Sequence, residues 1–406
     1  MNTQSLRRQL RCSYAYSFVL TLNITGAVWV ALLAARGYSL WQVGAAEGIF
    51  HVVSLLAEVP SGMAADLLGR RRVLALSGVV AALAALLMAF EQNFLWVCAS
   101  MALSALAYNL VSGSQEALVY DSLKEAGQSE RFLPVENVTT QVETAGAALG
   151  KLAGALTGVL GFTAFYLVDM GISLLRTVAA LGLREPAATP EQQARQAAPL
   201  RTLLAELPAN LRTHVTETAD FLCRSPRVVR YILAGAFIDL PAFLTLMYLQ
   251  QRLTDIGLPT AWLGAVLMLC EVGYPLGGWI GGRLRPRQMG RLYAVCVAGC
   301  GLCTVAMGTV SLAGAVAGGA GFAMFSTIWS LHARKRLNDW FPSDRRATLI
   351  SVDSMAYSLL MIPASPLTGW IGDMAGSAGA GLTVLGLLLL AAGTVVGLAA
   401  LQKRSA

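Results

Sequence analysis

Two side chains that can exchange protons lie one helical turn apart inside an apolar stretch. Glu47 and His51 both fall within residues 40–64, which are mostly hydrophobic. A charged side chain costs about 2.5–3.5 kcal/mol at the centre of a bilayer on insertion scales, so ionisable residues in such stretches are functional candidates. Burial disfavours an ionised carboxylate, and imidazole titrates near neutral pH. We therefore predict that this pair handles protons, with a hydrogen-bonded structural pair or an outer-surface position as the alternatives.

Further polar and aromatic residues in apolar stretches are candidates for contact with a substrate. Glu143 and Lys151 lie two helical turns apart, where they either hold a substrate or neutralise each other as an ion pair. Carboxylates in the second half of the chain suit a cationic substrate, and an aromatic side chain suits an amphiphile or, alternatively, core packing and membrane-interface anchoring. The remaining candidates for substrate contact are Asn109, Asp239, Glu271 and Trp329.

A motif of glycines and charged residues joins the second and third apolar stretches. It reads Gly-Met-Ala-Ala-Asp-Leu-Leu-Gly-Arg-Arg-Arg and starts at Gly62. Gly62 is expected to permit close helix contact, Asp66 to face a helix N-terminus, and Gly69 to turn the chain. Arg70 and Arg71 are then expected to reach carboxylates on neighbouring helices.

The composition of the chain identifies the elements that must position these residues. Of 406 residues, 56% are hydrophobic and 13% are charged, against about 25% charged in an ordinary soluble domain. A helix needs roughly 20 residues to cross a bilayer, and sustained apolar/polar alternation of the kind found in β-barrels is missing. We predict an all-α membrane protein with twelve transmembrane helices. They are expected at about 13–35, 40–64, 73–90, 94–120, 136–160, 162–183, 228–252, 260–282, 291–311, 313–337, 347–373 and 379–401.

The distribution of Lys and Arg predicts the orientation of these helices. If the N-terminus is cytoplasmic, only Arg36 and Arg252 fall in loops on the opposite side. Cytoplasmic loops of membrane proteins are enriched in Lys and Arg. We therefore expect a multi-pass protein of the cell inner (plasma) membrane with both termini in the cytoplasm. The net charge of +7 then reflects topology and does not indicate nucleic-acid binding.

An internal repeat divides the chain into halves. The Ser-Glu-Arg at 129–131 corresponds to the Ser-Asp-Arg at 343–345, at an offset of 214 residues, and the first and seventh apolar stretches begin at the same offset. This repeat predicts two six-helix bundles, at 1–183 and 228–406. The polar segment 184–227 between them carries leucines at three- and four-residue spacing, which predicts a cytoplasmic linker with an amphipathic helix.

The glycine- and charge-containing motif resembles the signature of the major facilitator superfamily. That signature joins the second and third helices by a glycine, an acid four residues on, a second glycine and paired basic residues. The twelve spans, the half-repeat and the linker extend the resemblance over nearly the whole chain. It implies a secondary transporter in which two pseudo-symmetric six-helix bundles rock around a midplane site. It further implies that the motif is a gate whose arginine pairs with an acid at the cytoplasmic end of the fourth helix, here Asp121.

Two departures from the family pattern bear on the direction of transport. Drug exporters often carry an arginine four residues before a glycine of the fourth helix, and before Gly113 that position is Asn109. Antiporters commonly have a Gly-Pro-rich fifth helix, whereas here glycines recur every four residues from Gly146 to Gly158 without proline, a pattern that favours close packing. Proton-coupled efflux of a small amphiphilic or cationic compound is the leading expectation. The alternatives are proton-coupled uptake of a nutrient or metabolite, and a membrane sensor that has lost transport.

Several patterns that would indicate enzyme chemistry do not hold. Cys296, Cys300 and Cys303 have the spacing of an iron–sulfur site but lie in a predicted membrane helix. The three histidines are too dispersed for a metal site, and no G-x4-G-K-[ST] loop occurs. We expect no enzyme activity, cofactor or metal. The expected partners are a small-molecule substrate, protons and the lipid bilayer, with no nucleic acid and with a monomer as the default.

Overall fold

A computed structural model of the chain describes most of its residues. The described ranges are 3–186, 226–286, 288–309, 311–340 and 346–402. Every regular element within them is helical, as the all-α prediction requires. The predicted amphipathic helix of the linker and the side chain of Asp66 lie outside what the structure describes.

The contacts divide the chain into two units, and each is described by itself. The first unit comprises Met1–Gly26 and Ile49–Phe221, and the second comprises Ala27–Gly48 and Leu222–Ala406. The segment Ala27–Gly48 precedes most of the first unit in sequence but packs with the second. The two predicted bundles, divided at 184–227, stay a prediction.

The first unit is built around α4, which packs against α5 and α8, while α1 packs against α7 and α8. A buried apolar cluster joins α1, α4, α6 and α8 through Tyr16, Leu74, Leu118 and Ala180. These contacts fix the ends of α4 and α6, where the candidate gate residues lie. The helices are α1 (Thr3–Thr21), α4 (Arg70–Ala89), α5 (Phe94–Val111), α6 (Ser114–Glu125), α7 (Phe132–Ala153), α8 (Phe162–Leu181) and most of α3 (Leu40–Leu68).

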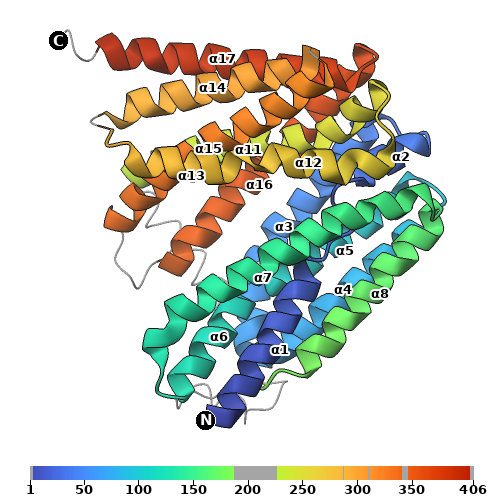
Figure 1. The fold of residues 1–406 in the computed structure, drawn as a ribbon, viewed down its shortest axis with the longest axis vertical. Helices are drawn as coiled ribbons and strands as arrows, with labels where there is room; N and C mark the ends of the chain where they lie inside the picture. The colour runs from blue at the N-terminus through green and yellow to red at the C-terminus, as the bar shows by residue number, and fades with distance from the viewer. Residues whose placement is uncertain (1–2, 187–225, 287, 310, 341–345, 403–406) are drawn as a thin grey trace. The chain divides into compact units, whose positions relative to one another are not determined.

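In the second unit α14 and α17 run side by side, as Figure 1 shows, and α11 packs against α15 and α16. Gly301 allows α14 and α17 to pack closely. An ideal Cβ at this position would lie only 2.6 Å from the backbone nitrogen of Leu390, so no larger residue fits there. The helices are α2 (Trp29–Ala35), the start of α3, α11 (Pro226–Asp255), α12 (Leu263–Glu271), α13 (Gly273–Arg283), α14 (Met289–Thr309), α15 (Leu312–Trp340), α16 (Arg346–Met374) and α17 (Ala378–Gln402).

Among the described residues, nine helical segments are long and apolar enough to cross a membrane. The three other predicted spans are 13–35, 136–160 and 347–373. The first is interrupted between α1 and α2, the second contains two glutamates and a lysine, and the third contains Asp353 and two prolines. The prediction of a helical membrane protein is confirmed, and the count of twelve spans stays a prediction.

Some predicted helices are broken in the structure. The predicted span 94–120 divides into α5 and α6 at Gly113, whose φ of +70° favours glycine, and helix then continues to Glu125. The predicted span 136–160 changes from α-helix to a 3-10 turn (Gly154–Gly158). Apolar content identifies the spans but carries little information on such local breaks.

Candidate functional site

The gate motif forms a sharp turn between α3 and α4. Gly69 has a φ of +88°, so the predicted turn at this glycine is confirmed. The close helix contact expected at Gly62 is not found, because an ideal Cβ there would meet no atom within 4 Å among the described residues. No described residue therefore packs against Gly62 in this structure.

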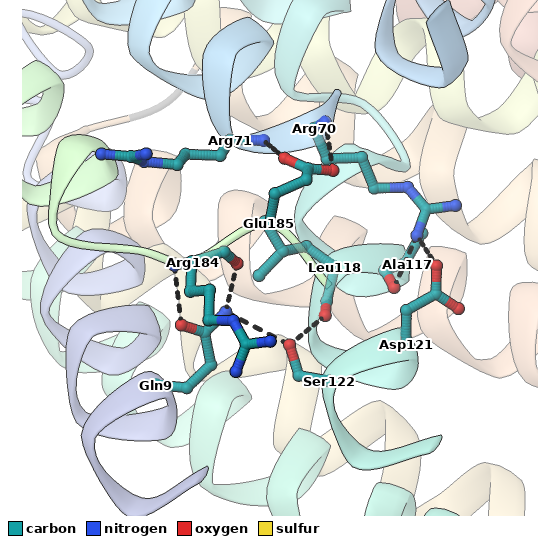
Figure 2. Close-up of polar contacts among 9 residues, drawn as sticks. All are labelled: Gln9, Arg70, Arg71, Ala117, Leu118, Asp121, Ser122, Arg184 and Glu185. Carbon is teal, nitrogen blue, oxygen red and sulfur yellow. Dashed lines mark hydrogen bonds and ion pairs between the residues drawn. The ribbon is translucent and has the colours of Figure 1, made fainter. Parts of the chain in front are cut away.

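Arg70, the first residue of α4, binds α6 through its guanidinium group. It forms an ion pair with the carboxylate of Asp121 and donates a hydrogen bond of 2.9 Å to the carbonyl oxygen of Ala117 (Figure 2). The Arg70 and Asp121 side chains are 18% and 11% exposed. Because water is largely excluded, this pair holds the start of α4 on α6. Its role as a gate stays a prediction.

Glu185, which the sequence reasoning missed, occupies the N-terminus of α4. Its carboxylate accepts hydrogen bonds from the backbone nitrogens of Arg70 and Arg71, at 2.9 and 2.7 Å (Figure 2). The first N–H groups of a helix lack intrahelical partners and carry partial positive charge, so a carboxylate is favourable there. Glu185 follows the sixth predicted span directly, but nothing in the sequence indicates that it meets the gate motif.

Among the described residues, the Arg71 guanidinium contacts a backbone carbonyl and no carboxylate. Its guanidinium donates to the carbonyl oxygen of Leu181 at the end of α8, at 2.7 Å. The last carbonyl groups of a helix are unsatisfied and attract cations, which accounts for this contact.

Polar contacts extend from Glu185 to α1 and α6. The Gln9 side-chain amide donates to the carbonyl oxygen of Arg184 at 2.9 Å and to the hydroxyl of Ser122 at 3.2 Å. The Arg184 backbone nitrogen donates in return to the Gln9 amide oxygen at 2.9 Å. Gln9, Arg70, Asp121, Arg184 and Glu185 are called the inner cluster below. It ties α1, α4 and α6 to the segment that follows α8.

Replacing Glu185 by glutamine should lower the stability of the first unit. The variant loses the charge at the α4 N-terminus, an interaction worth about 0.3–1 kcal/mol and up to about 2 kcal/mol when partly buried. The midpoint of thermal unfolding in detergent should fall measurably. The matched control is Glu130→Gln, which removes an exposed carboxylate from a nearby 3-10 turn. Equal midpoints for the two variants would contradict the assigned role of Glu185.

Glu47 and His51 are both buried on α3, being 3% and 5% exposed. Glu47 interacts electrostatically with Tyr248 of α11, and the His51 ring packs against Phe50 at 5.3 Å between centroids. Their burial speaks against an outer-surface position for the pair. It keeps both side chains available as proton-handling candidates.

Glu143 of α7 contacts a side chain of α6. The Gln115 side-chain amide donates to the Glu143 carboxylate at 2.9 Å and also donates to the hydroxyl of Ser17 on α1. Lys151 lies in the last turn of α7, before the 3-10 turn. The structure therefore brings Glu143 together with Gln115, and the Glu143–Lys151 ion pair stays a prediction.

Two of the predicted substrate contacts, Asn109 and Trp329, are buried among neighbouring helices, and their contact with a substrate stays a prediction. The Asn109 amide nitrogen donates to the carbonyl oxygen of Ser54 at 2.6 Å, and its amide oxygen accepts from the Ser54 hydroxyl at 2.9 Å. The buried Trp329 ring lies 4.7 Å from Tyr293 and 6.1 Å from Tyr231, between centroids. Asn109 thus joins α5 to α3, and Trp329 packs among aromatic rings of the second unit.

The carboxylates of the second unit include one that the sequence reasoning missed. Asp239 on α11 lies within electrostatic reach of Asp353 on α16 and of Arg334 on α15. Glu271 ends α12 and interacts electrostatically with Tyr274. Asp353 carries no motif around it, and Arg334 is explained equally well by the cytoplasmic bias of basic residues. Only the packing of α11, α15 and α16 brings the three together.

The chain resembles known membrane transporters in sequence and in structure. It is 23% identical over 259 residues to the "Uncharacterized MFS-type transporter YxaM" of Bacillus subtilis (strain 168), covering 63% of this chain and 61% of that protein. Among solved structures, the nucleoside transporter NupG matches with a TM-score of 0.74 at 12% identity and covers 99% of both chains. A mutant of the peptide transporter POT matches with a TM-score of 0.67 at 17% identity, covering 97% of this chain and 95% of the other.

These matches differ in what they establish. Because their sequence identities are low, the structural matches establish a shared fold and nothing about substrate. The Bacillus subtilis match spans less than two thirds of that protein. The family profile described as Major Facilitator Superfamily matches residues 12–337, which is most of the sequence. The chain therefore belongs to the Major Facilitator Superfamily and is a multi-pass membrane protein.

Proposed function

We propose that the protein exports a small amphiphilic or cationic compound in exchange for protons, by alternating access. The observation that carries this proposal is the buried carboxyl group of Glu47 on α3. Leu40–Ala65 is apolar and long enough to cross a membrane, and Glu47 is 3% exposed within it. An ionisable side chain that is buried in such a span is a candidate for binding and releasing a proton, which is the property that coupling to a proton gradient requires.

His51 supports the same role. It lies one helical turn beyond Glu47 on α3 and is also buried. Imidazole is the side chain that normally changes charge near neutral pH. His51 is therefore a second candidate, beside Glu47, for handling the coupled proton.

Grouped carboxylates in each unit support a cationic substrate. In the first unit Glu136 interacts electrostatically with Glu116 and Glu143. In the second unit Asp239 interacts in the same way with Asp353. Neighbouring carboxylates repel one another and raise the local concentration of cations. In the second unit the positive charge of Arg334 offsets only part of the negative charge, since it lies near two carboxylates.

Flux measurements on the purified protein test the proposed exchange. The protein is reconstituted in liposomes that contain a pH-sensitive dye, a pH gradient is imposed, and a panel of amphiphilic cations is added. Each transported compound should produce a proton flux opposite to its own movement, and liposomes without protein should produce none. The panel should include nucleosides and short peptides, because NupG and POT are described as nucleoside and peptide transporters. Absence of any compound-dependent proton flux would contradict the proposal.

Proton-coupled uptake is the second candidate, and the glycine series of α7 favours it. An ideal Cβ on Gly150 would lie 2.8 Å from the backbone nitrogen of Asn23, so this glycine has a packing role beside the end of α1. The proline of the antiporter pattern is missing from the series. The same liposome assay separates the two candidates, since uptake by symport moves protons and compound in one direction.

A further inference from the structure

The N-terminus of α3 is capped by a carboxylate from a helix more than 300 residues away in sequence. Asp373, near the end of α16, accepts hydrogen bonds from the backbone nitrogens of Leu40 and Trp41, at 2.9 and 2.8 Å. These N–H groups have no partner within their own helix, and the helix dipole favours a negative charge beside them. The contact therefore combines two directed hydrogen bonds with an electrostatic attraction.

A buried tyrosine of α11 makes a second contact at the same place. The Tyr248 hydroxyl donates to the carbonyl oxygen of Ser365 on α16 at 2.7 Å and lies 3.5 Å from the carbonyl oxygen of Leu40. Tyr248 is buried. It thus holds α16 in the position from which Asp373 reaches the start of α3.

Glycines allow the backbones to meet directly here. An ideal Cβ on Gly44 of α3 would lie 2.5 Å from both the Ser365 carbonyl oxygen and the Tyr248 hydroxyl oxygen. An ideal Cβ on Gly369 of α16 would collide with the Leu40 carbonyl oxygen. The backbones of α3 and α16 therefore meet directly at these two glycines.

The start of α3 belongs to a segment that packs in one unit but is joined in sequence to the other. Ala27–Gly48 packs in the second unit, yet the residues before and after it, Met1–Gly26 and Ile49–Phe221, belong to the first. A further hydrogen bond of 3.1 Å joins the backbone nitrogen of Val30 to the Gln250 side chain on α11. Any separate movement of the two units must therefore either detach this segment or strain its connections.

We propose that Asp373 is an outer latch, which holds the start of α3 on α11 and α16 in one state of the transport cycle and releases it in another. The latch rests on the proposed alternating-access function and, by the predicted topology, lies on the outer side of the membrane. Both Asp373 and Trp41 are exposed, so water can replace the hydrogen bonds when they break. Glu185 caps α4 in the same bidentate way within the inner cluster. One carboxylate thus fastens the beginning of α3, and another fastens the helix that follows its end.

The labelling rate of a buried cysteine measures how often the latch opens, and no substrate is needed. Ser365→Cys is suitable because Ser365 is 0% exposed and its backbone carbonyl, which accepts from Tyr248, is retained. A membrane-impermeant maleimide is added to right-side-out vesicles, and the labelling rate is measured with and without Asp373→Ala. The reporter is introduced after replacement of all native cysteines, namely Cys12, Cys98, Cys223, Cys270, Cys296, Cys300 and Cys303.

Asp373→Ala should raise the labelling rate about two- to fivefold, as expected for loss of an exposed charge at a helix N-terminus worth about 0.3–1 kcal/mol. The matched control is Asp255→Asn, an exposed carboxylate at the end of α11 that accepts from Gln251 at 2.8 Å and leaves α3 untouched. The control should label at the rate of the unsubstituted reporter. If Asp373→Ala does not fold, Gly369→Ala tests the same contact and should produce the same rise.

The results for the latch and for transport can be told apart. Equal labelling rates with and without the Asp373 substitution would overturn the latch, whatever the protein transports. A raised rate in a protein that moves none of the panel compounds would support the latch and contradict the proposed export function.

Discussion

Replacing Glu47 by glutamine is expected to abolish proton-driven accumulation of substrate while sparing downhill exchange. Glutamine keeps the shape of the buried side chain but cannot bind and release a proton. One proton exchanged for one substrate molecule across a one-unit pH gradient supplies about 1.4 kcal/mol, or about a tenfold concentration ratio. In reconstituted liposomes the ratio should fall from about ten to about one on this scale.

The control for this experiment is Glu91→Gln. Glu91 is also buried but lies in the turn between α4 and α5, outside α3. The Glu91→Gln variant should accumulate substrate to the same ratio as the unsubstituted protein. Normal accumulation by Glu47→Gln would show that another group carries the proton, with the Asp239 and Asp353 pair as the next to be substituted.

Breaking the Arg70–Asp121 ion pair is expected to reduce transport about tenfold and to destabilise the first unit. Removing one member of a fully buried pair costs about 3–5 kcal/mol, and we expect about 1–3 kcal/mol here because both side chains are partly exposed. Arg70→Ala, Asp121→Ala and the double substitution form a cycle. The double variant should lose little more stability than either single variant, since the second change removes a side chain that already lacks its partner.

Arg72→Ala is the matched control for this cycle. Arg72 lies in the same basic run but is exposed, and exposed substitutions usually change stability by less than about 0.5 kcal/mol. Thermal midpoints and initial transport rates are measured on all four variants. Additive losses, or an equal effect of Arg72→Ala, would mean that Arg70 and Asp121 act independently and that the basic run as a whole matters.

The helical membrane fold could be predicted from the sequence because bilayer crossing imposes a simple requirement. Each span needs a long apolar stretch, and the stretches around α4, α11 and α17 meet it without ambiguity. The turn at Gly69 was equally predictable, since a glycine before a basic run favours a left-handed backbone. Breaks such as the one at Gly113 were not, because a glycine inside a membrane helix serves packing as often as turning.

The partners of the candidate residues could be predicted only where a family pattern carried them. The resemblance directs Arg70 towards Asp121, and the two are in contact. Glu185, Asp353 and Asp373 have no motif, and their roles arise from packing between segments far apart in sequence. The backbone and hydroxyl partners of Arg71 and Asn109 could not be predicted in this way, because every segment of the chain supplies such groups.

The helix α3 is continuous and joins the contact at Leu40 to the turn at Gly69. Its 29 residues form one rod from Leu40 to Leu68, about 43 Å long at 1.5 Å per residue. Pro60 interrupts the backbone hydrogen bonding of this rod, since proline has no N–H to donate. The helix is therefore stiff along most of its length and bends most easily at Pro60, near its C-terminal end. A displacement of the helix at Leu40 would therefore be transmitted as far as Pro60, where the backbone can bend before the turn at Gly69.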